Sequence, residues 1–460
     1  MLRDVGFLEA IMSPDRVSSH ESARAERATD WGTDHGTEPD VVVWPASTEE
    51  VSATLEAATR RELPVTPYAA GTSIEGNPIP VHGGISMDLT RMDSVLEIRP
   101  ADHQIDVEPG VLGDAIDDAA GDHGLFFPPL PSSGDISTIG GMIANAASGM
   151  GTVKYGEIAD WVLELEAVLA DGSVITAGSK ASKTSSGYNL RDLIVGSEGT
   201  LAVVTRATLE LAGRPRQVRG GRALFSELDD AADAVADAVQ SGVDVAKIEL
   251  IDRDSARISN AYTGESLPDV PMVFLEFHAE HGVDDEVAFC EGIFAEHGVE
   301  RFEMADEEEM ADLWRARREL AVAIRASDPD RDIGHPGDVT VPISEYGSTV
   351  TRVKRLAEEY DLSIPCFGHA GDGNVHYIVL VDEDDPDELE RSAAAQEAII
   401  DHVLDVGGTV TGEHGIGLGK RDYLVREHGE ASVAAMRAVK RALDPTNTLN
   451  PGKILPDQSD

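Results

Sequence analysis

The sequence predicts an α+β protein of two or three domains. Its 460 residues exceed what a single core usually organises, and a hydrophobic content of 41% is enough for large cores. The chain opens as strand, helix, strand: an apolar run lies between prolines at 39–45, helical periodicity covers 51–61, and a second short run covers 63–67. From Val218 onward strands and helices alternate, which suits an antiparallel sheet with helices on one face.

Further elements follow in the first half of the chain. Residues 126–134 contain three prolines and cannot be helical, because proline removes a donor and clashes with the preceding turn. Asp171-Gly172 separates two apolar runs and predicts a hairpin over 161–177. The pattern changes around 213–215, where we expect a domain boundary. The remaining predicted elements are strands at 85–89, 95–99, 104–107 and 201–211 and a helix at 112–123.

The second half predicts strands and helices in alternation. A long helix over 305–325 carries Trp314 and several arginines. The final part, 421–447, has the periodicity of a helix pair. The other expected elements are strands beginning at 218 and covering 246–251, 272–278, 339–342 and 377–381, and helices at 227–240, 287–297 and 346–360.

The charge balance is strongly acidic. Acidic residues number 85 against 37 basic ones, and the net charge is −48. Such a surface repels nucleic acid and anionic membranes. Screening by salt makes it tolerable, so the composition favours a halophilic protein, with an acidic protein of ordinary salt as the alternative.

Cysteine content and hydropathy indicate an intracellular protein. Cys290 and Cys366 give no disulfide framework and too few thiolates for an iron–sulfur cluster. No run of 18 apolar residues predicts a membrane span, and the N-terminus lacks the apolar core of a signal peptide. We therefore expect a soluble, cytoplasmic protein.

Two glycine-rich segments, 368–376 and 411–415, carry the residues that indicate chemistry. Two histidines and a glutamate, His369, His376 and Glu413, form a ligand set typical of a catalytic divalent metal, because three protein ligands leave a position open for substrate. His414 directly follows Glu413 and can serve as a base near neutral pH. The alternative is a glycine-rich loop with solvated histidines.

Two further stretches indicate a cofactor site. The loop at 68–77 combines small residues, glycines and hydroxyls after a strand, which suits a nest of backbone N–H groups around phosphate. It is not a Gly-x-Gly-x-x-Gly motif, and an ordinary turn is the alternative. The small side chains at 137–149 require close packing, either against a planar aromatic cofactor or of a helix on a sheet.

Taken together, these segments resemble the FAD-linked 2-hydroxyacid dehydrogenases of the vanillyl-alcohol-oxidase superfamily. That group includes flavin D-lactate dehydrogenases, D-2-hydroxyglutarate dehydrogenases and the D subunit of glycolate oxidase. The resemblance runs from about residue 39 to residue 455. Its most specific pieces are Pro131-Ser132-Ser133 with Thr138-Ile139-Gly140-Gly141, residues 192–199, residues 369–376, Gly412-Glu413-His414-Gly415 and Asn450-Pro451-Gly452-Lys453.

The resemblance implies a fold and a cofactor. The fold is α+β, with a PCMH-type FAD-binding domain of two α+β subdomains at 1–215, a cap domain with an antiparallel sheet and helices at 216–420, and a C-terminal segment at 421–460. Covalent relatives place a histidine in the pyrophosphate loop, and Gly71-Thr72-Ser73 has none, so FAD is expected to be non-covalent. The residues implied in FAD binding are Pro67, Ala69, Ala70, Gly71, Thr72, Ser73, Gly76, Asn77, Pro131, Ser132, Ser133, Ser137, Thr138, Gly141, Asn145, Gly199, Val203 and Asn450.

The resemblance also assigns the substrate side. His369, His376 and Glu413 become ligands of Zn²⁺ or Mn²⁺, and His414 becomes the base. Arg317 matches the arginine that grips the substrate carboxylate; the alternative is a surface helix whose arginines balance nearby glutamates. Asn374 matches a position near the substrate. Many relatives carry a lysine before the strand at 338–342, whereas this chain has Gly334-His335-Pro336-Gly337, which leaves the identity of the substrate open.

The implied activity is oxidation of a small D-2-hydroxy acid to the 2-oxo acid. D-lactate is the first candidate, followed by glycolate and D-2-hydroxyglutarate; His414 removes the hydroxyl proton while hydride passes to flavin N5. Electrons then leave to a quinone, cytochrome, electron-transfer flavoprotein or iron–sulfur subunit. Peripheral membrane association through a partner and a homodimer are compatible with this. The alternatives are a non-catalytic flavin subunit of an oxidase complex, a non-redox flavoenzyme like alkyl-glycerone-phosphate synthase, and a metallohydrolase.

Overall fold

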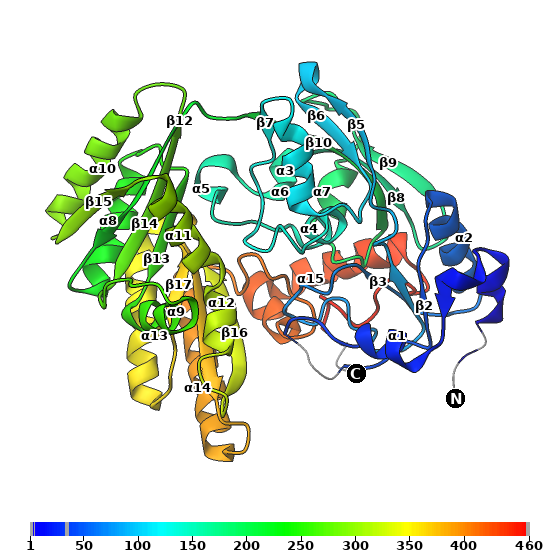
Figure 1. The fold of residues 1–460 in the computed structure, drawn as a ribbon. Coiled ribbons are helices and arrows are strands. Elements are labelled where there is room, and N and C mark those ends of the chain that lie inside the picture. The colour runs from blue at the N-terminus through cyan, green and yellow to red at the C-terminus, as the bar shows by residue number, and fades with distance from the viewer. Residues whose placement is uncertain (1–2, 4, 33–35, 457–460) are drawn as a thin grey trace. The chain divides into compact units, whose positions relative to one another are not determined.

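A computed structural model describes residues 3, 5–32 and 36–456. The chain forms two compact units, and Figure 1 labels most of their helices and strands. Unit 1 draws on 1–148, 157–214 and 413–460, and unit 2 on 149–156 and 215–412. The three domains expected at 1–215, 216–420 and 421–460 stay a prediction. Among the described helices, none combines the length and the apolar character needed to cross a membrane.

The first sheet of unit 1 is built from the strand–helix–strand opening. Its strand order is β1-β2-β4-β3, with β2, β4 and β3 parallel and β1 antiparallel. Buried Val43 and Ile85 pack with Leu55 of the amphipathic helix α2, which Ser47 caps at its N-terminus. The elements are β1 (Val17–Ser18), α1 (Glu21–Glu26), β2 (Val41–Val43), α2 (Thr48–Thr59), β3 (Val65–Tyr68) and β4 (Ile85–Asp88).

The second sheet of unit 1 is antiparallel, in the order β5-β6-β10-β8-β9. The predicted hairpin joins β8 to β9. Its loop has three residues, 170–172, rather than two, because the Leu169 amide donates to Ser173 and the Gly172 amide donates to Leu169, and Gly172 takes the left-handed position of this loop with φ +86°. The strands are β5 (Val95–Arg99), β6 (Gln104–Val107), β8 (Val162–Val168), β9 (Val174–Gly178) and β10 (Val203–Glu210), with β7 (Leu125–Phe126) paired to β11 (Ala212–Gly213).

Helices and an irregular proline-rich segment complete unit 1. Residues 127–138 are not helical, as their prolines predict. The predicted helix pair near the C-terminus is present as α15, which is broken at Gly429 by non-helical angles of φ 79° and ψ 158°. The helices are α3 (Gly113–Gly121), α4 (Ile139–Asn145), α6 (Ile158–Trp161), α7 (Leu190–Ile194) and α15 (Leu424–Leu443).

Unit 2 is organised on one antiparallel sheet of order β15-β12-β14-β13-β17-β18-β16. Its strands are β12 (Gln217–Leu224), β13 (Lys247–Ile251), β14 (Met272–Ala279), β15 (Arg301–Ala305), β16 (Asp332–Thr340), β17 (Cys366–His369) and β18 (Asn374–Val381). Its helices are α5 (Thr152–Tyr155), α8 (Leu228–Gln240), α9 (Arg253–Thr263), α10 (Val283–Glu296), α11 (Glu307–Arg318), α12 (Leu320–Arg325), α13 (Tyr346–Tyr360) and α14 (Pro386–Asp405).

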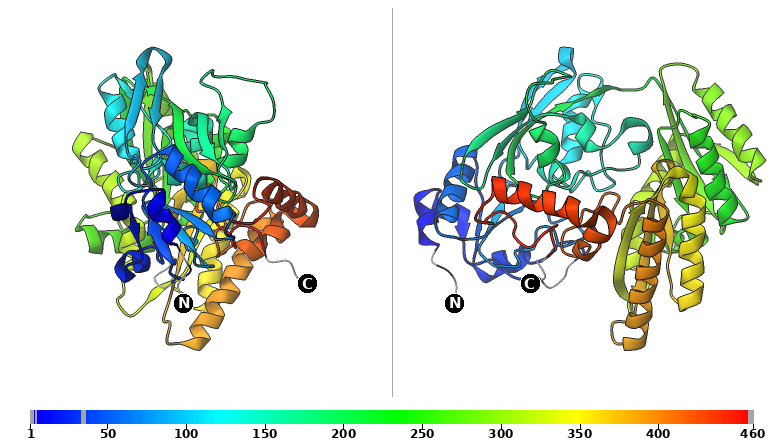
Figure 2. Two further views of the ribbon diagram at one scale, coloured as in Figure 1. Left: turned by 90° about the vertical axis from the view of Figure 1, so that its right-hand side faces the viewer. Right: turned by 180° about the vertical axis from the view of Figure 1, so that it is seen from behind.

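Helices cover both faces of this sheet, so the prediction that they lie on one face is wrong. Successive residues of β18 point to opposite faces. Tyr377 Oη donates to Gln396 of α14 over 2.9 Å, whereas Ile378 packs in the cluster of Trp314 from α11. Helices α8, α10, α13 and α14 therefore lie on one face, and α9, α11 and α12 on the other. Figure 2 shows α13 and α14 side by side.

The single long helix predicted over 305–325 is also wrong. Ala305 ends strand β15, and Asp306 caps α11 with a capping box that includes Glu309. The helix then divides at Glu319 into α11 and α12. Helix α11 packs against β12, β15 and α9, whereas α12 packs mainly against α9.

Strand β16 begins earlier than the glycines and proline before Asp338 predict. It lies at the edge of the sheet, where a proline does not interrupt a ladder on both sides. At Gly337 a Cβ would lie 2.2 Å from the ring of Tyr377, so this close approach requires glycine. The segment that replaces the lysine expected from relatives is thus part of a strand.

In unit 1 the fully buried Asp106 joins three basic residues, two on neighbouring strands and Lys180 just after β9. Its Oδ1 accepts from Arg99 Nη2 at 2.6 Å and from Thr208 Oγ1 at 2.7 Å, and its Oδ2 lies 2.8 Å from Lys180 Nζ and close to Arg206. Burial alone would raise the pKa of Asp106, but these donors outweigh it and hold the pKa well below its usual value.

Replacement of Asp106 by Asn should lower the free energy of unfolding by about 3 kcal/mol near pH 7, because it leaves buried donors and cations without their partner. The folded protein binds the proton of Asp106 more weakly than the unfolded chain, so this stabilisation is complete above about pH 5 and is lost as pH falls below about 4. Urea unfolding of both proteins from pH 3 to pH 8 at fixed salt measures it. A difference that does not shrink in acid would contradict the assignment.

Candidate functional site

The predicted histidines of unit 2 lie on adjacent strands of its sheet. His369 ends β17 and His376 lies in β18; only 4% and 6% of their surfaces are exposed. The strand register places Glu249 of β13 opposite His369 and Asp338 of β16 opposite His376. Four segments that are far apart in the sequence therefore present polar groups on one face.

Glu249 is the carboxylate between the predicted metal ligand and the predicted carboxylate-binding arginine. Its Oε1 lies 2.7 Å from Nδ1 of His369, and its Oε2 accepts from Nε of Arg317 at 2.7 Å. Burial raises the pKa of Glu249, but Arg317 and His369 outweigh it, so its pKa lies below the ordinary value. No sequence pattern marks this residue, because Glu249 lies in an ordinary apolar strand.

The geometry of the two histidines is compatible with a shared ligand. Their ring centroids are 5.1 Å apart at an interplanar angle of 85°, and their ligand atoms lie within 4.8 Å of each other. Phe367 lies beside His376 and Arg317. Its ring centroid is 5.3 Å from that of His376 and 4.8 Å from the guanidinium carbon of Arg317. Nη2 of Arg317 is buried and has no hydrogen-bond partner among the described residues.

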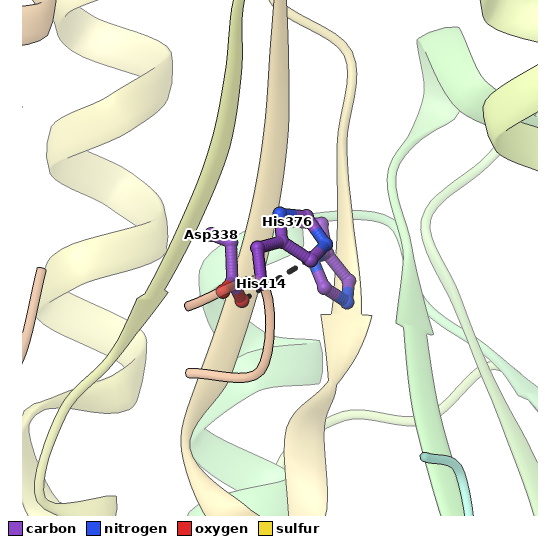
Figure 3. Close-up of side chains that lie close together, drawn as sticks. All are labelled: Asp338, His376 and His414. Carbon is purple, nitrogen blue, oxygen red and sulfur yellow. Dashed lines mark ion pairs between the residues drawn. The ribbon is translucent and has the colours of Figure 1, made fainter. Parts of the chain in front are cut away.

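Asp338 is the second fully buried carboxylate of this face. Its Oδ1 accepts from Asn374 Nδ2 at 2.7 Å, and its Oδ2 accepts from the Gly412 amide at 2.8 Å and from Thr411 Oγ1 at 3.1 Å. Figure 3 shows it beside His376, whose Nδ1 lies 3.6 Å from Oδ1. Asn374 is thus held through its amide nitrogen, while its buried Oδ1 has no hydrogen-bond partner in the described part of the chain.

Glu413 and His414 follow Gly412 directly in the chain. Because Gly412 is bonded to Asp338, the Cα of His414 lies within about 7 Å of the Gly412 Cα by chain length alone. Within unit 1, the backbone oxygen of Glu413 accepts from Asn145 Nδ2 at 2.7 Å, and its Oε2 accepts from Ser148 Oγ at 3.0 Å. The predicted flavin-contacting Asn145 therefore also holds a predicted metal ligand.

The predicted pyrophosphate loop of unit 1 has free backbone donors. Asp30 shapes it by accepting from the Gly76 amide at 2.9 Å, and Gly71 adopts φ +68°. The amides of residues 70–75 donate no hydrogen bond within the described residues. Thr72 Oγ1 accepts from Ser137 Oγ at 3.0 Å, which joins this loop to the segment before α4. A row of free N–H groups in a loop of small residues fits a phosphate.

An apolar cavity adjoins these segments in unit 1. It is lined by Pro67, Gly199 and Val203, three of the residues expected to bind FAD, and by Gly140 and Ala144. Ser133 Oγ lies 2.8 Å from Ser137 Oγ, and Thr138 caps α4 by accepting from Gly141. Asn77 donates to Asn145 at 3.2 Å, and Asn450 donates to the backbone of Asn77 at 3.0 Å. These residues fit a dinucleotide cofactor that has both an anionic and a flat apolar part.

Glu198 links these segments and was not among the predicted site residues. Its carboxylate accepts from the amides of Ile416 and Gly417 at 2.8 and 2.9 Å and from Asn77 Nδ2 at 2.7 Å. Its own carbonyl accepts from Asn450 at 2.8 Å, and its backbone is left-handed with φ +51°. Burial raises the pKa of Glu198 above its ordinary value, because the effect of burial is larger than the opposing effect of these hydrogen bonds. A left-handed non-glycine residue held from several sides is typical of functional sites.

Two protein families match the chain. Residues 39–178 match the FAD binding domain, and residues 214–454 match the FAD linked oxidases, C-terminal domain. The matches confirm the predicted resemblance and support FAD as the cofactor.

Named relatives cover nearly the whole chain. The probable mitochondrial D-lactate dehydrogenase of Danio rerio is 37% identical over 458 residues, 98% of this chain and 92% of its own length. The glycolate oxidase subunit GlcD of Bacillus subtilis (strain 168) is 35% identical over 448 residues, 96% of this chain and 95% of its own length.

Solved structures confirm the fold class. The 4-ethylphenol oxidase of Gulosibacter chungangensis superposes with a TM-score of 0.79 at 19% identity, covering 98% of this chain and 97% of its own. An alkyldihydroxyacetonephosphate synthase superposes with a TM-score of 0.78 at 20% identity, covering 97% and 84% of the two chains. At these identities the likeness shows the fold alone.

Replacement of Glu198 by Ala should lower the free energy of unfolding by about 3 kcal/mol, because three donors lose their acceptor in a buried place. Denaturant unfolding followed by tryptophan fluorescence measures this. Glu56→Ala is the control, since the Glu56 side chain is 54% exposed in the same unit. Equal stability of the Glu198 and Glu56 variants would show that the carboxylate does not hold these segments together.

Proposed function

Since the chain belongs to the family of FAD-linked oxidases, we propose that it oxidises a small D-2-hydroxycarboxylate to the 2-oxo acid, with D-lactate as the first candidate. It is an FAD-linked oxidoreductase related to D-lactate dehydrogenase and glycolate oxidase. The single observation that carries the choice of substrate class is Arg317, a buried guanidinium whose Nη2 has no hydrogen-bond partner among the described residues, on the same sheet face as two histidines.

Arg317 fits a substrate carboxylate. Its Nε is occupied by Glu249, so the Nη side of the planar group is left to hold a carboxylate oxygen. Lys247, the cation two residues before Glu249 on β13, lies 2.8 Å from Glu276 and 4.8 Å from the Trp314 ring centroid. Because Lys247 is already paired, this face favours a monocarboxylate over D-2-hydroxyglutarate, which has a second, distal carboxylate.

A divalent metal fits His369 and His376. We assign Glu413, which follows the anchored Gly412, as the third ligand, and the imidazole-rich set is compatible with Zn²⁺ or Mn²⁺. A bound divalent metal would lower the pKa of the substrate hydroxyl. Asp338 would hold His376 and Asn374 in place, since it is bonded to Asn374 and lies beside His376.

The chemistry then divides among few residues. Arg317 holds the carboxylate and so orients C2 of the substrate. His414 accepts the proton of the 2-hydroxyl while the C2–H bond breaks, with its electron pair leaving as hydride and the C–O bond becoming a carbonyl. FAD, when bound, supplies the acceptor for that hydride. The buried side chains around Phe367 exclude water from the arginine and His376.

The proposal also covers the acceptor of the electrons and the salt concentration at which the protein works. One relative is named as an oxidase subunit, which supports transfer to a partner protein, cytochrome, quinone or electron-transfer flavoprotein. The net charge of −48 supports adaptation to high salt, and assays are best run in molar salt.

Anaerobic addition of D-lactate to the FAD-loaded protein should bleach the flavin absorbance, and L-lactate should not. Glycolate and D-2-hydroxyglutarate are compared in the same series, and the paired state of Lys247 predicts the weakest response for the dicarboxylate. A yellow protein that no 2-hydroxy acid reduces would refute the proposed function.

His414→Ala should slow anaerobic flavin reduction about 10²- to 10⁴-fold while FAD stays bound, because a positioned base contributes on that order. Stopped-flow absorbance measures the rate, and the flavin spectrum after desalting measures retention. His428→Ala, at a side chain that is 41% exposed in the same unit, is the control. Rapid reduction in the His414 variant would reject the base assignment.

A further inference from the structure

We propose that Glu249 is a positioning residue for this oxidation, which sets the tautomer of His369 and the orientation of Arg317 through one carboxylate. The inference rests on the proposed function, because His369 and Arg317 are there a metal ligand and the substrate-binding arginine. No motif marks Glu249, and its role follows from the strand register that places β13 beside β17.

The histidine side of the bridge decides which nitrogen is available. A carboxylate only accepts hydrogen bonds, so the 2.7 Å contact between Oε1 and Nδ1 requires the proton of His369 to lie on Nδ1. Nε2 then keeps its lone pair and points away from Glu249. A carboxylate that fixes the tautomer of a metal-binding histidine in this way also raises its basicity as a ligand.

The arginine side of the bridge decides which donors are free. Oε2 of Glu249 accepts a hydrogen bond from Nε of Arg317 at 2.7 Å, and the ring centroid of Phe367 lies 4.8 Å from the guanidinium carbon. The hydrogen bond to Glu249 holds one edge of the guanidinium and the Phe367 ring covers its face, so the two contacts together fix the plane of the guanidinium. The Nη2 edge, which has no hydrogen-bond partner in the described chain, is thereby held ready for a carboxylate.

The bridge requires two acceptor atoms in a rigid place. Glu249 lies in a strand with neighbours on both sides and is fully buried, so its oxygens have little freedom to move. A glutamine at this position has the same size but offers a single acceptor oxygen and an NH₂ group. It can serve Arg317 or the Nδ1 proton of His369, and not both.

The experiment compares Glu249→Gln with a matched control, Glu276→Gln. Glu276 is a 5% exposed carboxylate on the neighbouring strand β14, with Oε1 2.8 Å from both Lys247 Nζ and His278 Nε2. FAD-loaded proteins are titrated with Zn²⁺ against a chromophoric chelator, and with Mn²⁺ in a second series. Glu249→Gln should weaken metal binding about 10- to 100-fold, and Glu276→Gln should leave it unchanged.

Kinetics give a second, independent readout. Loss of the fixed guanidinium should raise the KM for D-lactate in Glu249→Gln relative to the wild-type protein, in addition to any fall in kcat. In a His369→Ala background, the same substitution should no longer change metal affinity, because the tautomer effect acts only through His369. An undiminished effect in that background would overturn the tautomer role.

The outcomes separate this inference from the proposed function. Wild-type protein that binds neither Zn²⁺ nor Mn²⁺ would reject the metal site itself. Wild-type protein that binds metal, together with Glu249→Gln that binds it equally and keeps its KM, would reject the positioning role alone. Should Glu249→Gln fail to fold, Glu249→Asp keeps the charge but is one methylene shorter and cannot reach both partners, so the same loss of metal affinity is expected.

Discussion

A carboxylate removed from water must be matched by donors, and the candidate site is built on that constraint. Glu249, Asp338 and Glu198 are buried, and each is surrounded by donors from segments far apart in the chain. Each of these carboxylates contacts, or lies next in sequence to, residues with a proposed role. Holding functional groups through buried charge fixes them more firmly than apolar packing would, because any displacement leaves a charge or a donor without its partner.

The sheet of unit 2 turns this constraint into geometry. Glu249, His369, His376 and Asp338 come from four strands, and only their register brings them to one face. A shift of one residue in any pairing would turn the polar group of that strand to the opposite face, toward α8, α13 and α14. The buried ionic contacts and the strand register therefore support each other. A change to one carboxylate is expected to disturb its partners on the neighbouring strand before it disturbs the fold.

Much of the local structure could be predicted from the sequence, and the polar bridges could not. The hairpin at Asp171-Gly172, the helix at 346–360 and the glycine-rich histidine motif follow from local patterns. Helix α14 was missed although Asp385-Pro386 is a regular helix start, with the Asp385 side chain accepting from two amides. The strand through Gly334-His335-Pro336-Gly337 depends on Tyr377, 40 residues away from Gly337 in the chain, and no local pattern shows it.

The site residues divide along the same line. Motif residues such as His369 and Asn374 are visible because glycines surround them, whereas Glu249 and Glu198 are single carboxylates in otherwise ordinary stretches. Their partners lie 68 to 252 positions away, at Arg317 for Glu249 and at Asn450 for Glu198. A backbone at φ +51°, as in Glu198, also leaves no mark in the sequence. These two residues could not be predicted as site residues, because their roles depend on contacts between distant segments and on a left-handed backbone, and neither is encoded in a local sequence pattern.

The balance of charge in unit 2 bears on the metal. Next to the two histidines, Glu249 and Asp338 carry two negative charges, and Arg317 carries one positive charge that Glu249 already engages. An anionic substrate would add a third negative charge in a place of low dielectric constant, where repulsion between like charges is strong. If Arg317 holds the substrate carboxylate as proposed, a divalent cation on His369 and His376 would supply the missing positive charge beside it.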